Sequence, residues 1–129
     1  MLYFAYGSNL HHFQMKRRCK DSKFIKRINL KNFRLTFRSK YRAADIEVKK
    51  NSIVPGGLFE ISKSDEKKLD VYEDYPILYK KLYFSYYNKT VMTYIMVNKI
   101  LESLLQLFRK LEVLLNLPLL LLQFHLLLI

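Results

Sequence analysis

Residues 1–10 of the chain read MLYFAYGSNL. The apolar and aromatic run Met1–Ala5 is followed by a Gly-Ser-Asn turn signal and predicts a short buried strand. Asn9 is a residue type that caps helices, so we expect a helix over 10–19. Gly7 would allow a positive φ, and the N–H groups of the turn would then point into one space that suits a carboxylate or a developing oxyanion. An ordinary strand-to-helix turn is the alternative.

Further strands are predicted from alternation and turn residues. Apolar and polar residues alternate over 33–37, which is typical of a half-buried strand. A weaker strand is expected over 43–48. Another is expected over 53–61, and its Pro-Gly-Gly sequence predicts a bend or bulge near the start of that strand. The runs 82–87 and 90–97 are rich in aromatic and branched residues and are separated by two residues, which predicts a β-hairpin. Strands mixed with a few helices indicate a mixed α/β fold.

A short helix is expected before an isolated acid. Ser64 is followed by two carboxylates, which is typical of a helix start, and the helix should run to about Tyr72 before Pro76 prevents its continuation. Glu73 would lie at the end of this helix, where the helix dipole and aromatic neighbours both raise the pKa of a carboxyl group. Such an acid suits proton transfer near neutral pH. A surface glutamate in an acidic loop is the alternative, and Asp74 is the other acid considered.

Composition and charge narrow the function classes. The chain has 129 residues, of which 50% are hydrophobic, so it can form one globular core and is not a disordered tail. Its net charge is +12, concentrated in residues 16–50, where a solvated surface is favoured over a nucleic-acid interface. Cys19 is the sole cysteine, which excludes an intramolecular disulfide. No secretion signal or metal-ligand spacing is recognised, so we expect a cytoplasmic protein without a metal.

The last 31 residues differ in composition from the rest. Residues 99–129 are Leu-rich and are interpreted as a tail following a core of residues 1–98. Helical spacing over 101–115 predicts an amphipathic helix. The apolar run 119–129 is far shorter than the ~20 residues that span a bilayer, so a buried segment or an oligomer contact, such as a homodimer interface, is favoured over a membrane anchor. Translation of a frameshifted gene is a third interpretation of this tail.

Three segments resemble, in order, motifs of the gamma-glutamylcyclotransferase-like family. Residues 2–10 resemble its opening Tyr-Gly-Ser-Asn-Leu motif. Residues 54–61 resemble its Val-x-Gly-x-Leu-Tyr-x-Ile strand, and residues 69–79 resemble its Leu-Asp-x-x-Glu-Gly-x-Pro-x-x-Tyr segment. The resemblance covers about residues 1–98, and the combination of motifs is more specific than any one of them.

The resemblance implies a small mixed-sheet barrel with flanking helices and a cavity at one side. It implies an enzyme of glutathione metabolism, of transferase or lyase type, that cyclises a γ-glutamyl amine, amide or peptide to 5-oxoproline and a free amine. Glu73 would be the acid/base, and the substrate would be held by Tyr6, Gly7, Ser8, Asn9, Leu10 and Tyr79. Such a cyclisation requires no enzyme nucleophile, metal or cofactor. The expected partner is a small γ-glutamyl molecule, with neither nucleic acid nor a membrane involved.

The chain departs from the family pattern at two places. Asp74 stands where the family usually has Gly after the acid; Asp tolerates a positive φ, and its charge would raise the pKa of Glu73 further. The family often has a Tyr at the start of a C-terminal helix whose hydroxyl touches substrate, and the nearest residue here is Phe108. An inactive family member serving as a binding or interaction module is therefore the alternative to an enzyme, and a basic nucleic-acid-binding protein is the third hypothesis.

Overall fold

The computed structural model describes residues 1–38, 42–97, 107, 110 and 111. The chain forms two compact units, Met1–Met96 and Val97–Ile129, and every strand among the described residues belongs to the first. In the second unit, residues 107, 110 and 111 are helical. The rest of the helix expected over 101–115, the run 119–129 and Phe108 lie outside the described residues.

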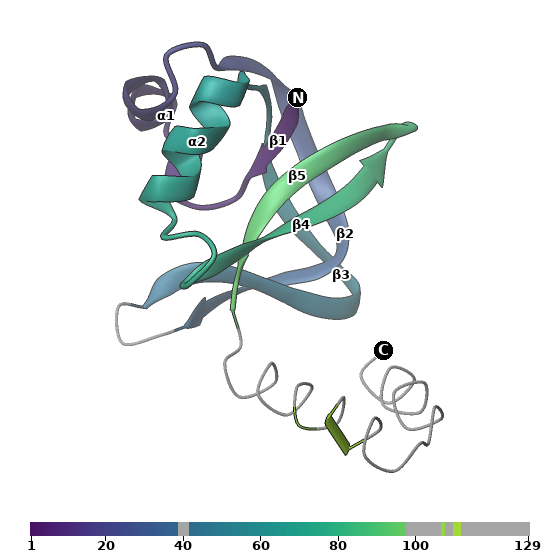
Figure 1. The fold of residues 1–129 in the computed structure, drawn as a ribbon. Helices are drawn as coiled ribbons and strands as arrows, with labels where there is room; N and C mark the ends of the chain where they lie inside the picture. The colour runs from purple at the N-terminus through teal and green to yellow at the C-terminus, as the bar shows by residue number, and fades with distance from the viewer. Residues whose placement is uncertain (39–41, 98–106, 108–109, 112–129) are drawn as a thin grey trace. The chain divides into compact units, whose positions relative to one another are not determined.

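A five-stranded mixed sheet forms the first unit, in the order β2-β3-β1-β5-β4. Its central strand β1 (Leu2–Ala5) pairs antiparallel with β3 (Ala43–Glu60) and parallel with β5 (Lys89–Met96). The edge strands are β2 (Lys23–Arg38) and β4 (Tyr79–Tyr86) (Figure 1). The mixed α/β class is confirmed. Over the described residues the sheet is open, because its edge strands do not pair with each other, so the closed barrel implied by the resemblance is not formed.

The expected strands 33–37, 43–48 and 53–61 are parts of two long strands. β2 and β3 pair antiparallel from the Lys23–Glu60 pair to the Arg38–Ala43 pair. The first half of β2 lies at a sheet edge with most of its side chains exposed, so it lacks the alternation that marks a half-buried strand. A register irregularity lies between Val48 and Ile53 of β3, at the start of the expected strand, so an irregularity near that start is confirmed. The Pro-Gly-Gly sequence is not its cause, because these residues pair with β2 without interruption.

Gly56 in this sequence serves close packing instead. A Cβ atom at Gly56 would lie 2.4 Å from the carbonyl oxygen of Ala5 and 2.4 Å from the ring of Phe4. No side chain fits at such distances, because real Cβ atoms essentially never approach other heavy atoms so closely. Gly56 therefore lets β3 lie against β1, the strand that leads to the glycine turn.

The turn after β1 differs from the prediction. Gly7 has φ −114°, so the expectation of a positive φ is wrong, and Ser8–Leu10 form one turn of 3-10 helix. The helix expected over 10–19 is present as α1 (His12–Arg18), but His11 caps it, accepting from the Gln14 N–H at 3.4 Å. Asn9 is not the cap, because its side chain is buried and bonded elsewhere.

The second helix is capped two residues earlier than predicted. α2 (Lys63–Tyr72) has Ser62 as its N-cap in place of Ser64. The Ser62 hydroxyl accepts from the Asp65 N–H at 3.1 Å, and the Asp65 carboxylate accepts from the Ser62 N–H at 3.5 Å. This capping box fixes the start of the helix. Its end agrees with the prediction, since Tyr72 is the last helical residue and Glu73 is the C-cap.

The predicted hairpin is confirmed with its turn shifted by one residue. β4 and β5 pair antiparallel up to the Tyr86–Lys89 pair. Tyr87 and Asn88 form the turn, with φ values of 45° and 61°. A two-residue turn with positive φ at both positions matches the right-handed twist of the strands it joins.

The core is divided between the two faces of the sheet. Side chains alternate across β1, so Tyr3 and Ala5 lie on one face and Phe4 on the other. Met15 of α1 and Leu69 of α2 pack against the first face, and Figure 1 shows both helices on that side of β1. The glycine turn and the end of α2 therefore meet beside the same sheet face. No described residue belongs to a helix long and apolar enough to cross a membrane.

Candidate active site

A cavity of about 360 Å³ lies where the glycine turn, the end of α2 and the sheet meet. It is lined by Tyr3, Tyr6, Gly7, Ser8, Asn9, Ala43, Ala44, Tyr72, Glu73, Tyr79 and Tyr94. Every site residue expected from the sequence is in this lining except Leu10. Leu10 lines a separate cavity of about 410 Å³ with His12 and Phe24, and its N–H donates to the Gly7 carbonyl at 2.9 Å. The backbone N–H of Leu10 is thus hydrogen-bonded within the turn.

Glu73 reaches the cavity from the end of α2. Its backbone N–H donates to the Leu69 carbonyl at 2.8 Å, so the last turn of the helix fixes its backbone. Its Oε1 accepts from Asn9 Nδ2 at 3.0 Å. This hydrogen bond joins two residues that are 64 positions apart, and it connects the glycine turn directly to the acid.

Burial is the main cause of the perturbed acidity of Glu73. Desolvation raises the pKa of its carboxyl from 4.5 to about 7, although the Asn9 hydrogen bond and the Arg18 charge both lower it. The direction of this pKa shift agrees with the expectation, and of the two expected causes desolvation is the leading one, not the helix dipole. A carboxyl group with such a pKa can both accept and return a proton near neutral pH.

Asp74 adopts the backbone conformation that glycine would favour. Its φ is 50°, in the left-handed region, where Asp and Asn are tolerated better than most residues. This explains how Asp can stand where the family usually has Gly. Its side chain is exposed, and burial, not the neighbouring charge, dominates the pKa of Glu73.

Asn9 is a structural partner of the acid rather than a free donor. Its side chain is 3% exposed, and its Nδ2 donates to both the Tyr3 hydroxyl at 2.9 Å and to Glu73. Its Oδ1 accepts from Arg18 Nη1 at 2.5 Å. All polar groups of the Asn9 side chain are therefore engaged around Glu73.

Arg18 was not expected from the sequence. It lies at the end of three consecutive cations, and charge alone does not tell which of them points inward. The spacing of Arg18 from Met15 could have shown which arginine points inward. Met15 is fully buried, and a residue three positions later lies on the same face of the helix. The Arg18 guanidinium lies 3.6 Å from the centre of the ring of Tyr72, a residue that lines the cavity.

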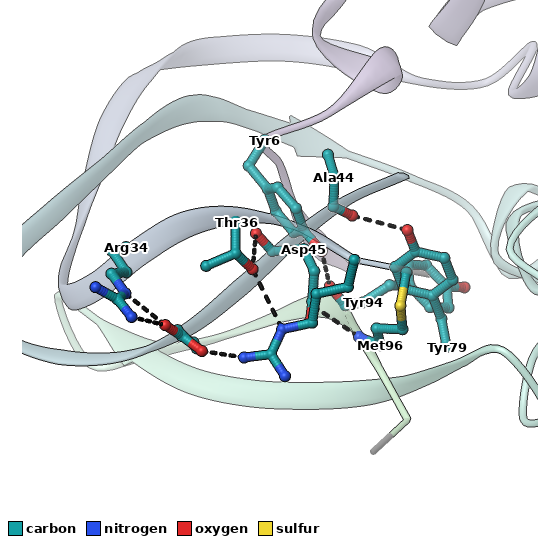
Figure 2. A network of polar contacts seen from close by, with 10 residues as sticks. Tyr6, Arg34, Thr36, Ala44, Asp45, Tyr79, Tyr94 and Met96 are labelled. Atoms are coloured by element: carbon teal, nitrogen blue, oxygen red, sulfur yellow. Dashed lines mark hydrogen bonds and ion pairs between the residues drawn. The ribbon is translucent and has the colours of Figure 1, made fainter. Parts of the chain in front are cut away.

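Tyrosine hydroxyls tie the cavity walls to the backbone. Tyr6 donates to the Tyr94 carbonyl at 2.6 Å, and Tyr79 donates to the Ala44 carbonyl at 2.7 Å (Figure 2). Asp45, next to Ala44, accepts from the Met96 N–H at 2.8 Å. These bonds hold the start of β3 against β5 and β4. Burial raises the pKa of Tyr79 to about 12, so its hydroxyl stays protonated and remains a donor.

The described ranges 1–38 and 42–97 hold no group of three His, Cys, Asp or Glu side chains that could bind a metal ion. The residues that line the cavity contribute the Glu73 carboxyl, the Asn9 amide, hydroxyls and the backbone of the glycine turn. They can bind polar groups of a ligand and move a proton.

Solved structures share the fold of this chain. A structure titled gamma-glutamyl cyclotransferase is 26% identical, with a TM-score of 0.65, and the match covers 76% of this chain and 67% of that one. An uncharacterized human protein is 25% identical, with a TM-score of 0.64 and coverage of 75% and 66%. The chain thus spans about two thirds of the length of these two relatives.

A solution structure of an Escherichia coli protein shares the fold, with 19% identity, a TM-score of 0.61 and coverage of 76% and 84%. No curated protein matches the sequence. The family model described as gamma-glutamyl cyclotransferase, AIG2-like, matches residues 3–109, which include the glycine turn and Glu73. The chain therefore belongs to the gamma-glutamyl cyclotransferase, AIG2-like family.

Proposed function

We propose that this protein is a cofactor-independent enzyme that converts a γ-glutamyl amine, amide or peptide into 5-oxoproline and a free amine. One observation carries the proposal. The glycine turn and Glu73 line the same cavity of about 360 Å³, and the carboxyl has a pKa of about 7. We place the reaction, which uses a small-molecule substrate, in the cytoplasm.

Glu73 begins the reaction as a general base. Its carboxylate takes a proton from the α-ammonium group of the substrate, and the neutral amine attacks the γ-carbonyl carbon of the same molecule. A new C–N bond closes the five-membered ring. Binding in a folded conformation favours this step, because it holds the two reacting atoms near each other. No enzyme nucleophile is needed, since the substrate carries its own.

The glycine turn stabilises the charge that develops on the carbonyl oxygen. The N–H groups of Ser8 and Asn9 begin a 3-10 helix, where they have no helical acceptor, and they serve as donors to the oxyanion. Tyr3 accepts from Asn9 and can donate its own hydrogen to the substrate. Protonated Glu73 then gives its proton to the departing amine as the old C–N bond breaks, and the restored carboxylate takes the second proton from the ring nitrogen and passes it to the released amine, which leaves as an ammonium ion.

Mass-spectrometric detection of 5-oxoproline from a panel of γ-glutamyl dipeptides and γ-glutamyl amines tests the proposal. Glu73→Gln keeps the shape and the bond from Asn9 but removes the base, so the rate should fall by about 10³-fold, within the range of general acid–base catalysis. Asp74→Asn is the matched control, because it removes a neighbouring exposed charge and should retain activity. Full activity of Glu73→Gln would exclude the mechanism.

The same assay separates the enzyme from an inactive family member. A wild-type protein that binds 5-oxoproline in calorimetry but turns over no substrate of the panel would be a binding module, and the proposed reaction would be rejected.

A further inference from the structure

The side chain of Arg18 is bonded to four neutral oxygen atoms, and three of them belong to residues that line the cavity. Nη1 donates to Ser8 Oγ at 3.0 Å and to Asn9 Oδ1 at 2.5 Å. Nη2 donates to Gln14 Oε1 at 3.2 Å and to the Tyr72 hydroxyl at 2.7 Å. The guanidinium is thus held in one orientation by four acceptors, and two of them, Ser8 and Asn9, belong to the glycine turn.

This arrangement fixes which end of the Asn9 amide faces the acid. A primary amide has a carbonyl end that only accepts and an NH2 end that only donates. Because guanidinium groups only donate, the carbonyl end of Asn9 must face Arg18. The NH2 end then faces Glu73 Oε1 and the Tyr3 hydroxyl. A rotated amide would place its oxygen against the carboxylate and its NH2 against the cation.

We propose that Arg18 is a positioning residue for Glu73: it locks the Asn9 amide so that Asn9 donates to Glu73 Oε1, which aims the carboxyl into the cavity and favours its ionised form. The effect on the reaction rests on the proposed function. The effect on the carboxyl itself does not, so the two can be tested separately.

Arg18 differs in charge from the other titratable groups around Glu73. Tyrosine hydroxyls face the carboxyl from β1, β4 and β5, and burial raises the pKa of each of them, so they stay neutral. Tyr72 of α2 lines the same cavity, and the charge of Asp45 of β3 raises the pKa of Tyr79. Among the described residues, Arg18 is the cation whose charge lowers the pKa of Glu73.

Arg18→Met removes both the charge and the hydrogen bonds, while Arg18→Lys keeps the charge and one donor group. Arg17→Met is the matched control, since it makes the same change in net charge at an adjacent, exposed arginine. In each protein, the Glu73 carboxyl is titrated by ¹³C NMR with labelled glutamate, and the pH dependence of kcat/KM is measured with the best γ-glutamyl substrate. Circular dichroism checks that each variant is folded.

Arg18→Met should move the Glu73 titration and the acidic limb of the kcat/KM profile to higher pH by about one unit, the size expected for loss of a nearby opposite charge. The rate should be about tenfold lower at pH 6 and recover at high pH, since one pKa unit is a tenfold change in the fraction ionised. In Arg18→Lys the Glu73 carboxyl should titrate close to its wild-type pH, and in Arg17→Met the titration of Glu73 should not shift.

An unshifted titration in Arg18→Met, or an equal shift in Arg17→Met, overturns the inference. If Arg18→Met does not fold, Arg18→Gln takes its place with the same expected direction of shift. A wild-type protein without turnover rejects the proposed reaction but leaves the NMR comparison as a full test of Arg18.

Discussion

Replacing Glu73 with Gln should stabilise the fold above neutral pH while it removes activity. The folded protein binds the Glu73 proton more tightly than the unfolded chain, because burial raises the pKa from 4.5 to about 7. As the pH rises from 4.5 through 7, the unfolded chain loses this proton first, so the wild-type protein loses stability. Above pH 7 both states are ionised and the loss is complete. A glutamine has no proton to lose, and the variant avoids this decline.

The size of the effect follows from the pKa difference. One pKa unit corresponds to ~1.4 kcal/mol, so the rise sets an upper bound of ~3.4 kcal/mol for the stability lost at high pH. Glu73 is partly exposed and keeps its bond from Asn9, so we expect roughly half of this, ~1.5 kcal/mol, after solvent screening. For a domain of this size that is a difference in Tm of about 8 °C.

Urea denaturation and thermal melts of the whole chain, followed by circular dichroism between pH 4.5 and 8.5, measure this difference. Comparing each variant with wild type at the same pH cancels the titration of the other acids. Glu60→Gln is the control, because its side chain is exposed and its difference from wild type should not grow with pH. If the difference for Glu73→Gln stays constant over this range, or if the variant is less stable than wild type at pH 8, the burial argument is wrong.

Two further predictions concern the elements that hold the site. Gly56→Ala should lower stability by about 2 kcal/mol in urea denaturation, because the new Cβ overlaps the ring of Phe4; an unchanged midpoint would show that the strands can separate without cost. Ser62→Ala should cost about 1 kcal/mol through loss of the N-cap of α2, whereas Ser64→Ala at the cap expected from the sequence should be neutral. Equal losses in the two serine variants would contradict the observed cap.

Local sequence patterns determined the elements nearest the site. The apolar run Met1–Ala5 forms a strand because a short apolar segment before a turn has few alternatives, and the hairpin 82–97 follows from two β-rich runs around a two-residue turn. The end of α2 before Glu73 was also predictable, since Pro76 stops a helix. These properties depend on residues close together in the chain.

The environment of Glu73 was decided by the tertiary structure. Burial is the main cause of its raised pKa. This burial arises when α1 and α2 pack against the sheet face that contains Tyr3 and Ala5 of β1. Asn9 suits a helix cap by residue type, but packing turns its amide toward Glu73 and Arg18 instead. Hydrogen-bond partners 64 positions apart leave no local pattern, so the sequence by itself could name the acid and the turn but neither the bond between them nor the arginine that donates to Asn9. Only the folded chain brings these groups within bonding distance.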